Sequence, residues 1–131
     1  MTRRERPCQS CVSHHLTILT GNIEDSWEFY RRLPKSEVKP LSAEEGYFEV
    51  TFDDSVIGVF DSAVFATATS TSPGSPGGAV IQFSVGDVNE YWSQLPDTYR
   101  EASTSPKKMP WGSYSAYVAD PDGNILEFCT W

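Results

Sequence analysis

The stretch Ser113-Tyr-Ser-Ala-Tyr-Val-Ala-Asp-Pro-Asp-Gly-Asn-Ile-Leu-Glu-Phe-Cys-Thr-Trp131 decides how this chain folds. Two runs of β-forming residues flank the four residues Asp120-Pro-Asp-Gly123. Pro121 favours a φ of about −65°, and Gly123 tolerates a positive φ, as a tight turn requires. The segment therefore predicts a β-hairpin near the end of the chain.

The second strand of this hairpin has two chemically different faces, because successive side chains of a strand alternate. Leu126 and Phe128 share one face. The opposite face carries Glu127 between Ile125 and Cys129. A carboxylate that is buried in the middle of a strand must be paired, bound to a metal or neutralised. Glu127 is therefore the first candidate site residue.

Length and composition limit the class of protein. The 131 residues suffice for one domain or for two small half-modules that share a core. The net charge of −8 argues against binding to a nucleic-acid backbone and is compatible with a cationic or neutral ligand. No run approaches the roughly 20 apolar residues of a membrane helix, and no secretory signal is visible. We expect a cytoplasmic protein with no nucleic-acid or membrane partner.

The N-terminal residues 1–11 are expected to form a flexible tail. Within it, Cys8 and Cys11 form a C-x2-C pair upstream of His14 and His15, and zinc takes thiolate and imidazole ligands. No second pair of this kind follows, which favours a ragged N-terminus over a zinc site. The chain has three cysteines, which cannot all pair with one another, and this fits a reducing compartment.

The first half of the chain contains a strand, a helix and a hairpin. Asn22 is a good N-cap, with Asp25 at the third helical position as a weak capping box. The apolar stripe of this helix is Ile23, Trp27 and Tyr30. The predicted elements are a strand over residues 15–20, a helix that starts after Asn22 and ends before Pro34, a short segment near 37–41, and strands over 46–52 and 56–61 joined at Asp53-Asp54.

Residues 66–78 are rich in Ala, Thr, Ser, Pro and Gly, which is typical of a flexible linker. The pattern before the linker recurs after it at an offset of 65 residues. The matching pairs are Ile18 with Phe83, Asn22 with Asp87, Ile23 with Val88 and Trp27 with Trp92. We therefore predict an α+β fold of tandem β-α-β-β-β modules. The predicted divisions are a tail over 1–11, a first module over 12–65, a linker over 66–78 and a second module over 79–131.

Each module has one helix, so one face of its sheet is covered and the other is open. The predicted covered set is apolar and comprises Leu16, Ile18, Phe48, Val50, Phe52, Phe60, Ile81, Phe83, Val85, Ala116, Val118, Leu126 and Phe128. The predicted open set is mixed and includes His15, Thr17, Tyr47, Glu49, Ile57, Val59, Val80, Gln82, Ser115, Tyr117 and Glu127. Two open faces that curve toward each other would form a cleft for a small molecule.

The candidate ligand-binding residues come from these open faces and from the approach to the last hairpin. There, Trp111 offers a flat surface on which an aromatic or cationic ligand can stack. A strand histidine satisfied by the backbone and a solvated rim carboxylate are the alternative interpretations of His15 and Glu49. The full candidate set is His15, Tyr47, Glu49, Gln82, Trp111, Tyr117 and Glu127.

Three motifs together resemble the vicinal oxygen chelate superfamily, which includes glyoxalase I, extradiol dioxygenases and the fosfomycin and bleomycin resistance proteins. They are the strand and helix from His15 to Tyr30, its repeat from Val80 to Asp87, and the segment from Pro110 to Phe128. The resemblance spans about residues 12–131. It implies a curved mixed sheet with a central cleft, the glyoxalase/bleomycin resistance fold. Function belongs to the site more than to the fold.

The resemblance also implies where metal ligands would stand. Carried over by position, they are His15, Val59, Val80 and Glu127, of which His15 and Glu127 can coordinate a metal ion and the two valines cannot. An incomplete set is expected to bind Zn²⁺, Mn²⁺ or Fe²⁺ weakly unless another group completes it. We therefore expect no metal cofactor, with a divalent metal held by His15 and Glu127 as the alternative.

Three functions remain open at this level. The resemblance favours a metal-free protein of the bleomycin-resistance kind, which sequesters a hydrophobic or cationic small molecule. The alternative is a divalent-metal-dependent lyase, isomerase or dioxygenase, in which the metal polarises vicinal oxygens and Glu127 exchanges a proton. A regulatory module with a vestigial cleft is the third. A homodimer is expected, because the family pairs its modules within one chain or across two chains, and the linker permits either arrangement.

Overall fold

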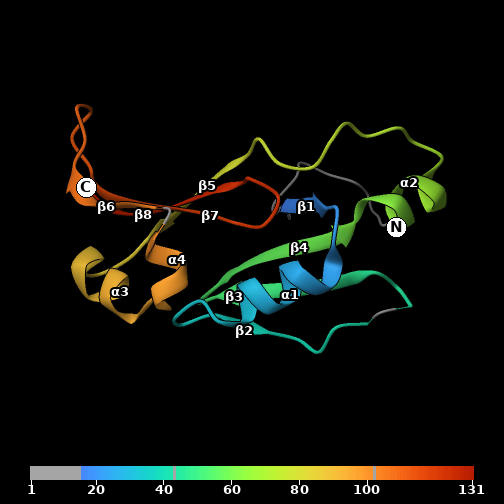
Figure 1. Cartoon of the computed structure of the whole chain (residues 1–131), viewed down its shortest axis with the longest axis horizontal. Coiled ribbons are helices and arrows are strands. Elements are labelled where there is room, and N and C mark those ends of the chain that lie inside the picture. Colours follow the sequence, from blue (N-terminus) through green and yellow to red (C-terminus); the bar gives the residue numbers. More distant parts are fainter. Residues whose placement is uncertain (1–15, 43, 102) are drawn as a thin grey trace, which may run out of the picture.

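The computed structural model describes residues 16–42, 44–101 and 103–131 (Figure 1). The first half contains β1 (Leu16–Thr20), α1 (Ile23–Arg31), β2 (Glu37–Val38), β3 (Tyr47–Phe52), β4 (Ser55–Asp61) and α2 (Ser62–Thr69). The second half contains β5 (Val80–Ser84), α3 (Val88–Gln94), α4 (Asp97–Glu101), β6 (Thr104–Lys108), β7 (Tyr114–Ala119) and β8 (Ile125–Thr130).

Two sheets of four strands have the same internal order. The first sheet is β1-β4-β3-β2 and the second is β5-β8-β7-β6. In each sheet the first strand pairs in parallel with the last strand of its module, and the other pairings are antiparallel. The predicted α+β class and the order of the strands are therefore confirmed, but each module has a second helix, α2 and α4, that was not predicted. No helix in the described ranges is both long enough and apolar enough to cross a membrane.

The helix starts were predictable because their caps are local. The Asn22 side chain accepts a hydrogen bond from the backbone N–H of Asp25 at 3.0 Å. The Asp87 side chain accepts one from Glu90 N–H at the same distance. Each bond satisfies a backbone donor that the first turn of a helix leaves free, and both predicted caps are confirmed.

One part of the predicted linker is helical instead. Helix α2 extends to Thr69, so residues 66–69 belong to it and only residues 70–79 lie outside helices and strands. The Asp61 side chain caps this helix by accepting from Val64 N–H at 3.0 Å. Alanine, which has the highest helix propensity, alternates with threonine in this part, and an acidic cap precedes it. The prediction of a linker was based on the low-complexity composition and did not consider the alanine content or the acidic cap.

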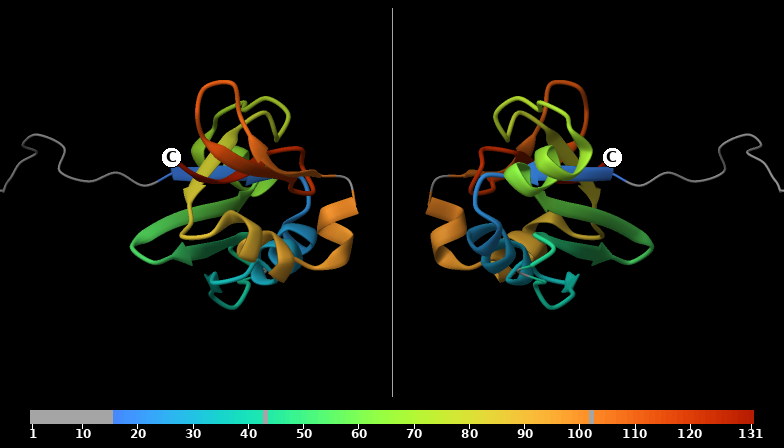
Figure 2. Two further views of the ribbon diagram at one scale, coloured as in Figure 1. Left: turned by 90° about the vertical axis from the view of Figure 1, so that its left-hand side faces the viewer. Right: turned by 90° about the vertical axis from the view of Figure 1, so that its right-hand side faces the viewer.

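The core is shared by the two modules. Phe52 of β3 and Phe83 of β5 approach to 4.5 Å between ring centroids, so the modules meet through aromatic side chains. Helix α1 packs on the first sheet, and α3 and α4 pack on the second. The three helices lie near one another (Figure 2), and the rings of Phe29 in α1 and Tyr99 in α4 are stacked. The buried apolar residues of this core are Ile18, Tyr30, Leu33, Phe48, Val50, Ile57, Val59, Ile81, Phe83, Tyr91, Leu95, Val118, Leu126 and Phe128.

The predicted faces of β4 were wrong. Val59 pairs with Phe48 and is fully buried in the core, whereas the prediction placed it on the open face. Ile57 is likewise buried on the core side, and Phe60 turns to the open face, where its ring lies 5.2 Å from that of Tyr47. The physical reason is register. The two-residue turn after Phe52 pairs it with Ser55, so odd-numbered residues of β4 share the core face with even-numbered residues of β3.

The turn between β7 and β8 joins the two modules. The buried Asp120 carboxylate accepts hydrogen bonds from the backbone N–H groups of Asp122 and Asn124, and from the side chain of Asn124, each at 2.9 Å. It also accepts a hydrogen bond from the Tyr30 hydroxyl of α1, with 2.6 Å between Tyr30 OH and Asp120 Oδ2. Asp122 accepts from the backbone N–H of Gly21 at 2.9 Å. The predicted hairpin is thus confirmed, and its turn is also a contact between modules.

Replacing Tyr30 with Phe is expected to destabilise the protein by about 1–3 kcal/mol, because it removes one donor from the buried Asp120 carboxylate. Urea unfolding measures the change. Tyr114→Phe is the matched control, since the Tyr114 hydroxyl donates to Asn89 in an exposed contact, and it is expected to change stability by no more than about 0.5 kcal/mol. Equal losses in the two variants would contradict this role of Tyr30.

Burial, and then the charge of Asp120, raise the pKa of the Tyr30 hydroxyl. A pKa that is higher in the folded than in the unfolded state contributes stability that is complete below about pH 10 and is lost as the pH rises further. The stability difference between the natural protein and Tyr30→Phe is therefore expected to shrink above about pH 10. Unfolding curves between pH 8 and 11 would refute this if the difference stayed constant or grew.

Candidate functional site

The candidate site lies on the open face of the second sheet, around Glu127. Strand β8 is central in this sheet, with β5 on one side and β7 on the other. The register places Gln82 of β5 and Tyr117 of β7 directly beside Glu127. Cross-strand neighbours on one face are close enough for their side chains to interact. The hairpin and the parallel pairing therefore bring together three residues that are distant in sequence.

Three side chains donate hydrogen bonds to the Glu127 carboxylate. Gln82 Nε2 lies 3.1 Å from Oε1, and Ser115 Oγ and Tyr117 OH lie 2.9 and 3.0 Å from Oε2. Ser113 extends this group, because its hydroxyl lies 2.8 Å from that of Ser115. Glu127 is buried, with an exposed fraction of 5%. These bonds satisfy the requirement that a buried carboxylate be paired.

The residues Gln82, Ser115, Tyr117 and Glu127 are called the Glu127 cluster below. In this cluster Oε2 accepts two hydrogen bonds and Oε1 accepts one. A carboxylate oxygen has two lone pairs, so Oε1 retains the capacity to accept another donor. No Lys or Arg of the described ranges forms a salt bridge with Glu127. The cluster can therefore offer a hydrogen-bond acceptor to a ligand.

The neighbours of Glu127 are held in their protonated forms. Burial, followed by the hydrogen bond to Glu127 and its charge, raises the pKa of the Tyr117 hydroxyl above its usual value. Burial and the charge of Glu127 also raise the pKa of the Cys129 thiol. Tyr117 thus remains a donor at neutral pH. Cys129 remains a thiol, which is a poor nucleophile and a poor metal ligand.

The open face of the first sheet carries a different set. In the row equivalent to Gln82, Glu127 and Tyr117, the register places Thr17, Gly58 and Glu49. Gly58 therefore occupies the place that Glu127 has in the second module, which corrects the assignment of Val59 to a chelating position. A Cβ atom at Gly58 would lie 2.7 Å from the Tyr47 hydroxyl oxygen, so only glycine leaves room for that ring.

Tyr47 and Glu49 of the first sheet are neighbours. The Tyr47 hydroxyl donates to Glu49 Oε2 at 3.1 Å, and Lys39 Nζ lies 3.3 Å from Glu49 Oε1. Burial, followed by the hydrogen bond to Glu49 and its charge, raises the pKa of Tyr47. Within the described ranges, the hydrogen bond of the Tyr47 hydroxyl goes to Glu49, and those of Glu127 come from the second sheet. The candidate residues thus form two separate groups in one chain.

The remaining candidates are scattered. Trp111 lies between β6 and β7 and is 61% exposed, and Val80 at the start of β5 is 63% exposed. His15, Cys8 and Cys11 lie outside the described residues. Ser115 was missed as a site residue, although its place on the predicted open face, two residues before Tyr117, was a usable signal.

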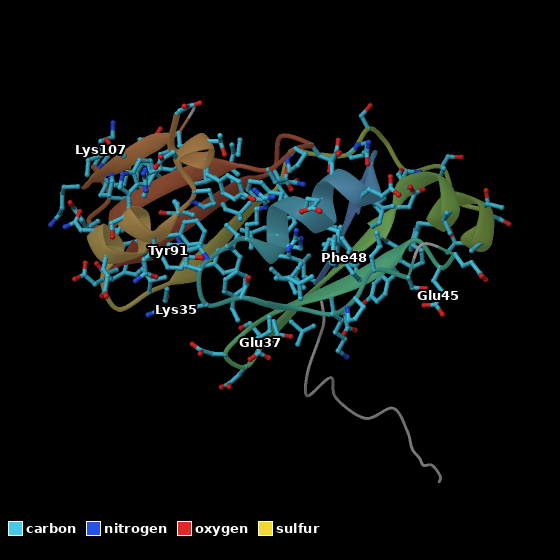
Figure 3. The ribbon with its side chains drawn as sticks, turned by 60° about the horizontal axis from the view of Figure 1, so that its bottom comes forward. Lys35, Glu37, Glu45, Phe48, Tyr91 and Lys107 are labelled. Carbon is cyan, nitrogen blue, oxygen red and sulfur yellow. The ribbon has the colours of Figure 1, made fainter. Side chains whose placement is uncertain are left out.

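A cavity lies between the modules, but it is not the predicted cleft, because different side chains line it. Its volume is about 880 Å³, and its walls include Phe52, Ile57, Ile81, Phe83 and Phe128. These belong to the covered faces, whereas the open faces were predicted to form the cleft. The covered faces meet because the aromatic core of each module is incomplete alone, and joining the two removes more apolar surface from water. Figure 3 shows Tyr91 and Lys35, which also line the cavity, beside each other.

The described donor set does not fit a zinc site or a facial-triad iron site. Such sites use at least three protein ligands of the His, Cys and carboxylate type. The described ranges contain no group of three or more such side chains that could hold a metal ion. Around Glu127 the other groups are one amide and two hydroxyls, all of which donate to the carboxylate.

Comparison with known proteins gives the fold a family. Residues 12–128 match the model of the Glyoxalase/Bleomycin resistance protein/Dioxygenase superfamily. The hypothetical protein SA1046 from S. aureus is 16% identical, with a TM-score of 0.73 over 94% of this chain and 96% of that chain. A lactoylglutathione lyase from Agrobacterium tumefaciens is 18% identical, with a TM-score of 0.68 over 92% and 95%.

A third similar structure is TioX from Micromonospora sp. ML1, which is 17% identical, with a TM-score of 0.68 over 89% of this chain and 97% of that chain. A search of curated proteins finds no significant match. At these identities the solved structures support the fold, and the chemistry has to be argued from the residues of this chain.

Cys129 is expected to resist alkylation while the protein is folded, because its side chain is fully buried and its thiol pKa is raised. The measurement is iodoacetamide labelling at pH 8 followed by peptide mapping. Labelling of Cys129 is expected only after unfolding in guanidinium. Native labelling at the rate of glutathione would show that the open face beside Glu127 is not packed as described.

Proposed function

Because the chain belongs to the glyoxalase/bleomycin resistance protein/dioxygenase superfamily, we propose that it binds a hydrophobic or cationic small molecule at the Glu127 cluster and sequesters it without chemistry. The observation that carries this proposal is the Glu127 carboxylate, which accepts hydrogen bonds from three side chains and forms no salt bridge within the described ranges. A preorganised acceptor of this kind suits a ligand that brings a positive charge or an N–H donor.

The surroundings of the cluster support binding more than catalysis. The Tyr117 ring offers a partly apolar wall next to the carboxylate, and the overall charge of −8 attracts cations. The pKa of the neighbouring Cys129 thiol is raised, so at neutral pH the thiol stays protonated and is a poor nucleophile. Sequestration of a toxic compound, including an antibiotic, in the cytoplasm is the biological role within this proposal.

A homodimer forms part of the proposal. Within the described ranges, five large apolar residues are exposed, with exposures from 38% to 74%, namely Leu16, Val64, Val80, Trp111 and Trp131. Val80 is the first residue of β5 and Trp131 follows β8, and these two strands carry Gln82 and Glu127. A second copy that covers them would give the ligand an opposite wall. Analytical ultracentrifugation is expected to show a dimer. A monomer at high protein concentration would contradict the proposed homodimer.

A divalent-metal-dependent lyase, isomerase or dioxygenase is the second candidate. The position of Glu127, which corresponds to a metal ligand in the superfamily, favours this candidate. The candidate also requires His15 as a second ligand. Elemental analysis of the purified protein distinguishes the two candidates. Less than stoichiometric Zn, Mn or Fe, with binding unchanged in His15→Ala, is expected. A firmly held, stoichiometric metal that His15→Ala releases would overturn the first candidate.

Binding is expected to survive removal of metal ions and to depend on Glu127. The probes are planar aromatic cations with their neutral counterparts, titrated calorimetrically into protein treated with EDTA. We expect saturable binding of the cations with one site per chain, and Glu127→Gln is expected to weaken it by about tenfold or more, because a charge-assisted hydrogen bond becomes a neutral one.

Glu45→Gln is the matched control. It removes the same charge from an exposed loop (Figure 3) and is expected to leave affinity within about twofold. Equal weakening in both variants would mean that overall charge, and not the cluster, attracts the ligand. Absence of binding by every probe would contradict the proposal.

A further inference from the structure

The hydroxyl groups of the Glu127 cluster have a fixed direction of hydrogen bonding. An ionised carboxylate only accepts, so Ser115 and Tyr117 both use their hydroxyl hydrogens to donate to Glu127 Oε2. The hydroxyl oxygens of Ser113 and Ser115 lie 2.8 Å apart. Because the Ser115 hydrogen is already used, Ser113 is the donor of that pair. The charge of Glu127 therefore sets the direction of each of these bonds.

The amide of Gln82 is oriented by the same carboxylate. Its Nε2 atom donates to Glu127 Oε1 at 3.1 Å, and the reverse orientation would bring two acceptors together. The carbonyl oxygen is therefore the end of the amide that is not bonded to Glu127. Gln82 is exposed, and within the described ranges no side chain donates to its carbonyl oxygen. That oxygen can accept a hydrogen bond from a ligand.

Acceptors outnumber donors in the part of the cluster that a ligand can reach. Glu127 Oε1 accepts a single hydrogen bond within the described ranges, and the Tyr117 oxygen can accept as well as donate. The donor that remains is the second hydrogen of the Gln82 amide. Lys107 of the outer strand β6 is in register with Ser115, but it forms no salt bridge with Glu127. A ligand at this site therefore has to supply donors.

The next row of the same face is apolar. Two residues before Gln82 and Glu127 along their strands, Val80 pairs with Ile125, which in turn pairs with Ala119 of β7. Residues two apart in a strand share a face. Val80 is 63% exposed, Ala119 is exposed and Ile125 is half-buried. These three residues, called the apolar row below, lie where the rest of a ligand held at the cluster would lie.

We propose, building on the function proposed above, that the ligand is a cation with at least two N–H groups, attached to an apolar group that lies on the apolar row. Primary ammonium, amidinium and guanidinium ions belong to this class. Their N–H groups donate to Glu127 Oε1 and to the Gln82 carbonyl oxygen. A quaternary ammonium ion has the same charge but no N–H group, so it leaves both acceptors unpaired and is rejected.

Three probes of equal charge test this ligand class. They are benzylammonium, benzyldimethylammonium and benzyltrimethylammonium, which share one ring and carry several, one and no N–H groups. Each is titrated at neutral pH into protein treated with EDTA, and the NMR signals of the Gln82 side-chain amide give the dissociation constant. Affinity is expected to fall along the series, with benzylammonium binding about tenfold or more tightly than benzyltrimethylammonium.

Two variants separate hydrogen bonding from apolar contact, provided that their thermal unfolding remains cooperative. Glu127→Gln replaces a group that only accepts by an amide that also donates. It is expected to bring the affinities of the three probes within about twofold of one another. Val80→Ser removes part of the apolar row. It is expected to weaken binding of all three probes by about threefold without changing their order.

Equal affinities of the natural protein for the three probes, all weakened by Glu127→Gln, would overturn the ligand class and leave the proposed function standing. A preference for benzylammonium that persists in Glu127→Gln would also overturn the ligand class, because the preference would then arise elsewhere. Unchanged affinities in Val80→Ser would overturn the role of the apolar row. Failure of every probe to bind would contradict the proposed function itself.

Discussion

The register of the β7–β8 hairpin is the constraint on which the core and the candidate site both depend. Side chains alternate along a strand, so a slip of one residue would move Glu127 into the core and Leu126 out of it. The buried Asp120 carboxylate opposes such a slip, because it accepts three hydrogen bonds within the turn and a fourth from Tyr30 of the other module. The contact that joins the modules therefore also fixes the position of Glu127.

The two faces of the second sheet have different roles, one in stability and the other in the proposed binding. One face supplies Leu126 and Phe128 to the shared aromatic core, where burial of apolar surface is favourable. The other supplies the Glu127 cluster, where a buried carboxylate is tolerated because its donors come from neighbouring strands. Strand β5 contributes to both faces, since the Gln82 side chain bonds to Glu127 while Ile81 and Phe83 line the cavity between the modules.

Local signals in the sequence predicted much of this structure. The caps at Asn22 and Asp87 and the hairpin turn depend on neighbouring residues alone, and the internal repeat located the second module. Glu127 was found because a carboxylate in mid-strand is unusual. Val59 was assigned to the wrong face of β4. The face on which a residue lies depends on the register between strands, which the length of the turn sets and which the internal repeat does not reveal. The cavity between the covered faces was not predicted, because module packing is not a local property.

A double-mutant cycle between Ser115 and Glu127 tests the central claim most directly, since it isolates the contact that holds the carboxylate on the open face. Ser115→Ala and Glu127→Leu, each of which removes the hydrogen bond, and the double variant would be compared with the natural protein by urea unfolding. The buried 2.9 Å hydrogen bond between the two side chains predicts a coupling energy of about 1–2 kcal/mol. Strict additivity of the two single changes would contradict the account.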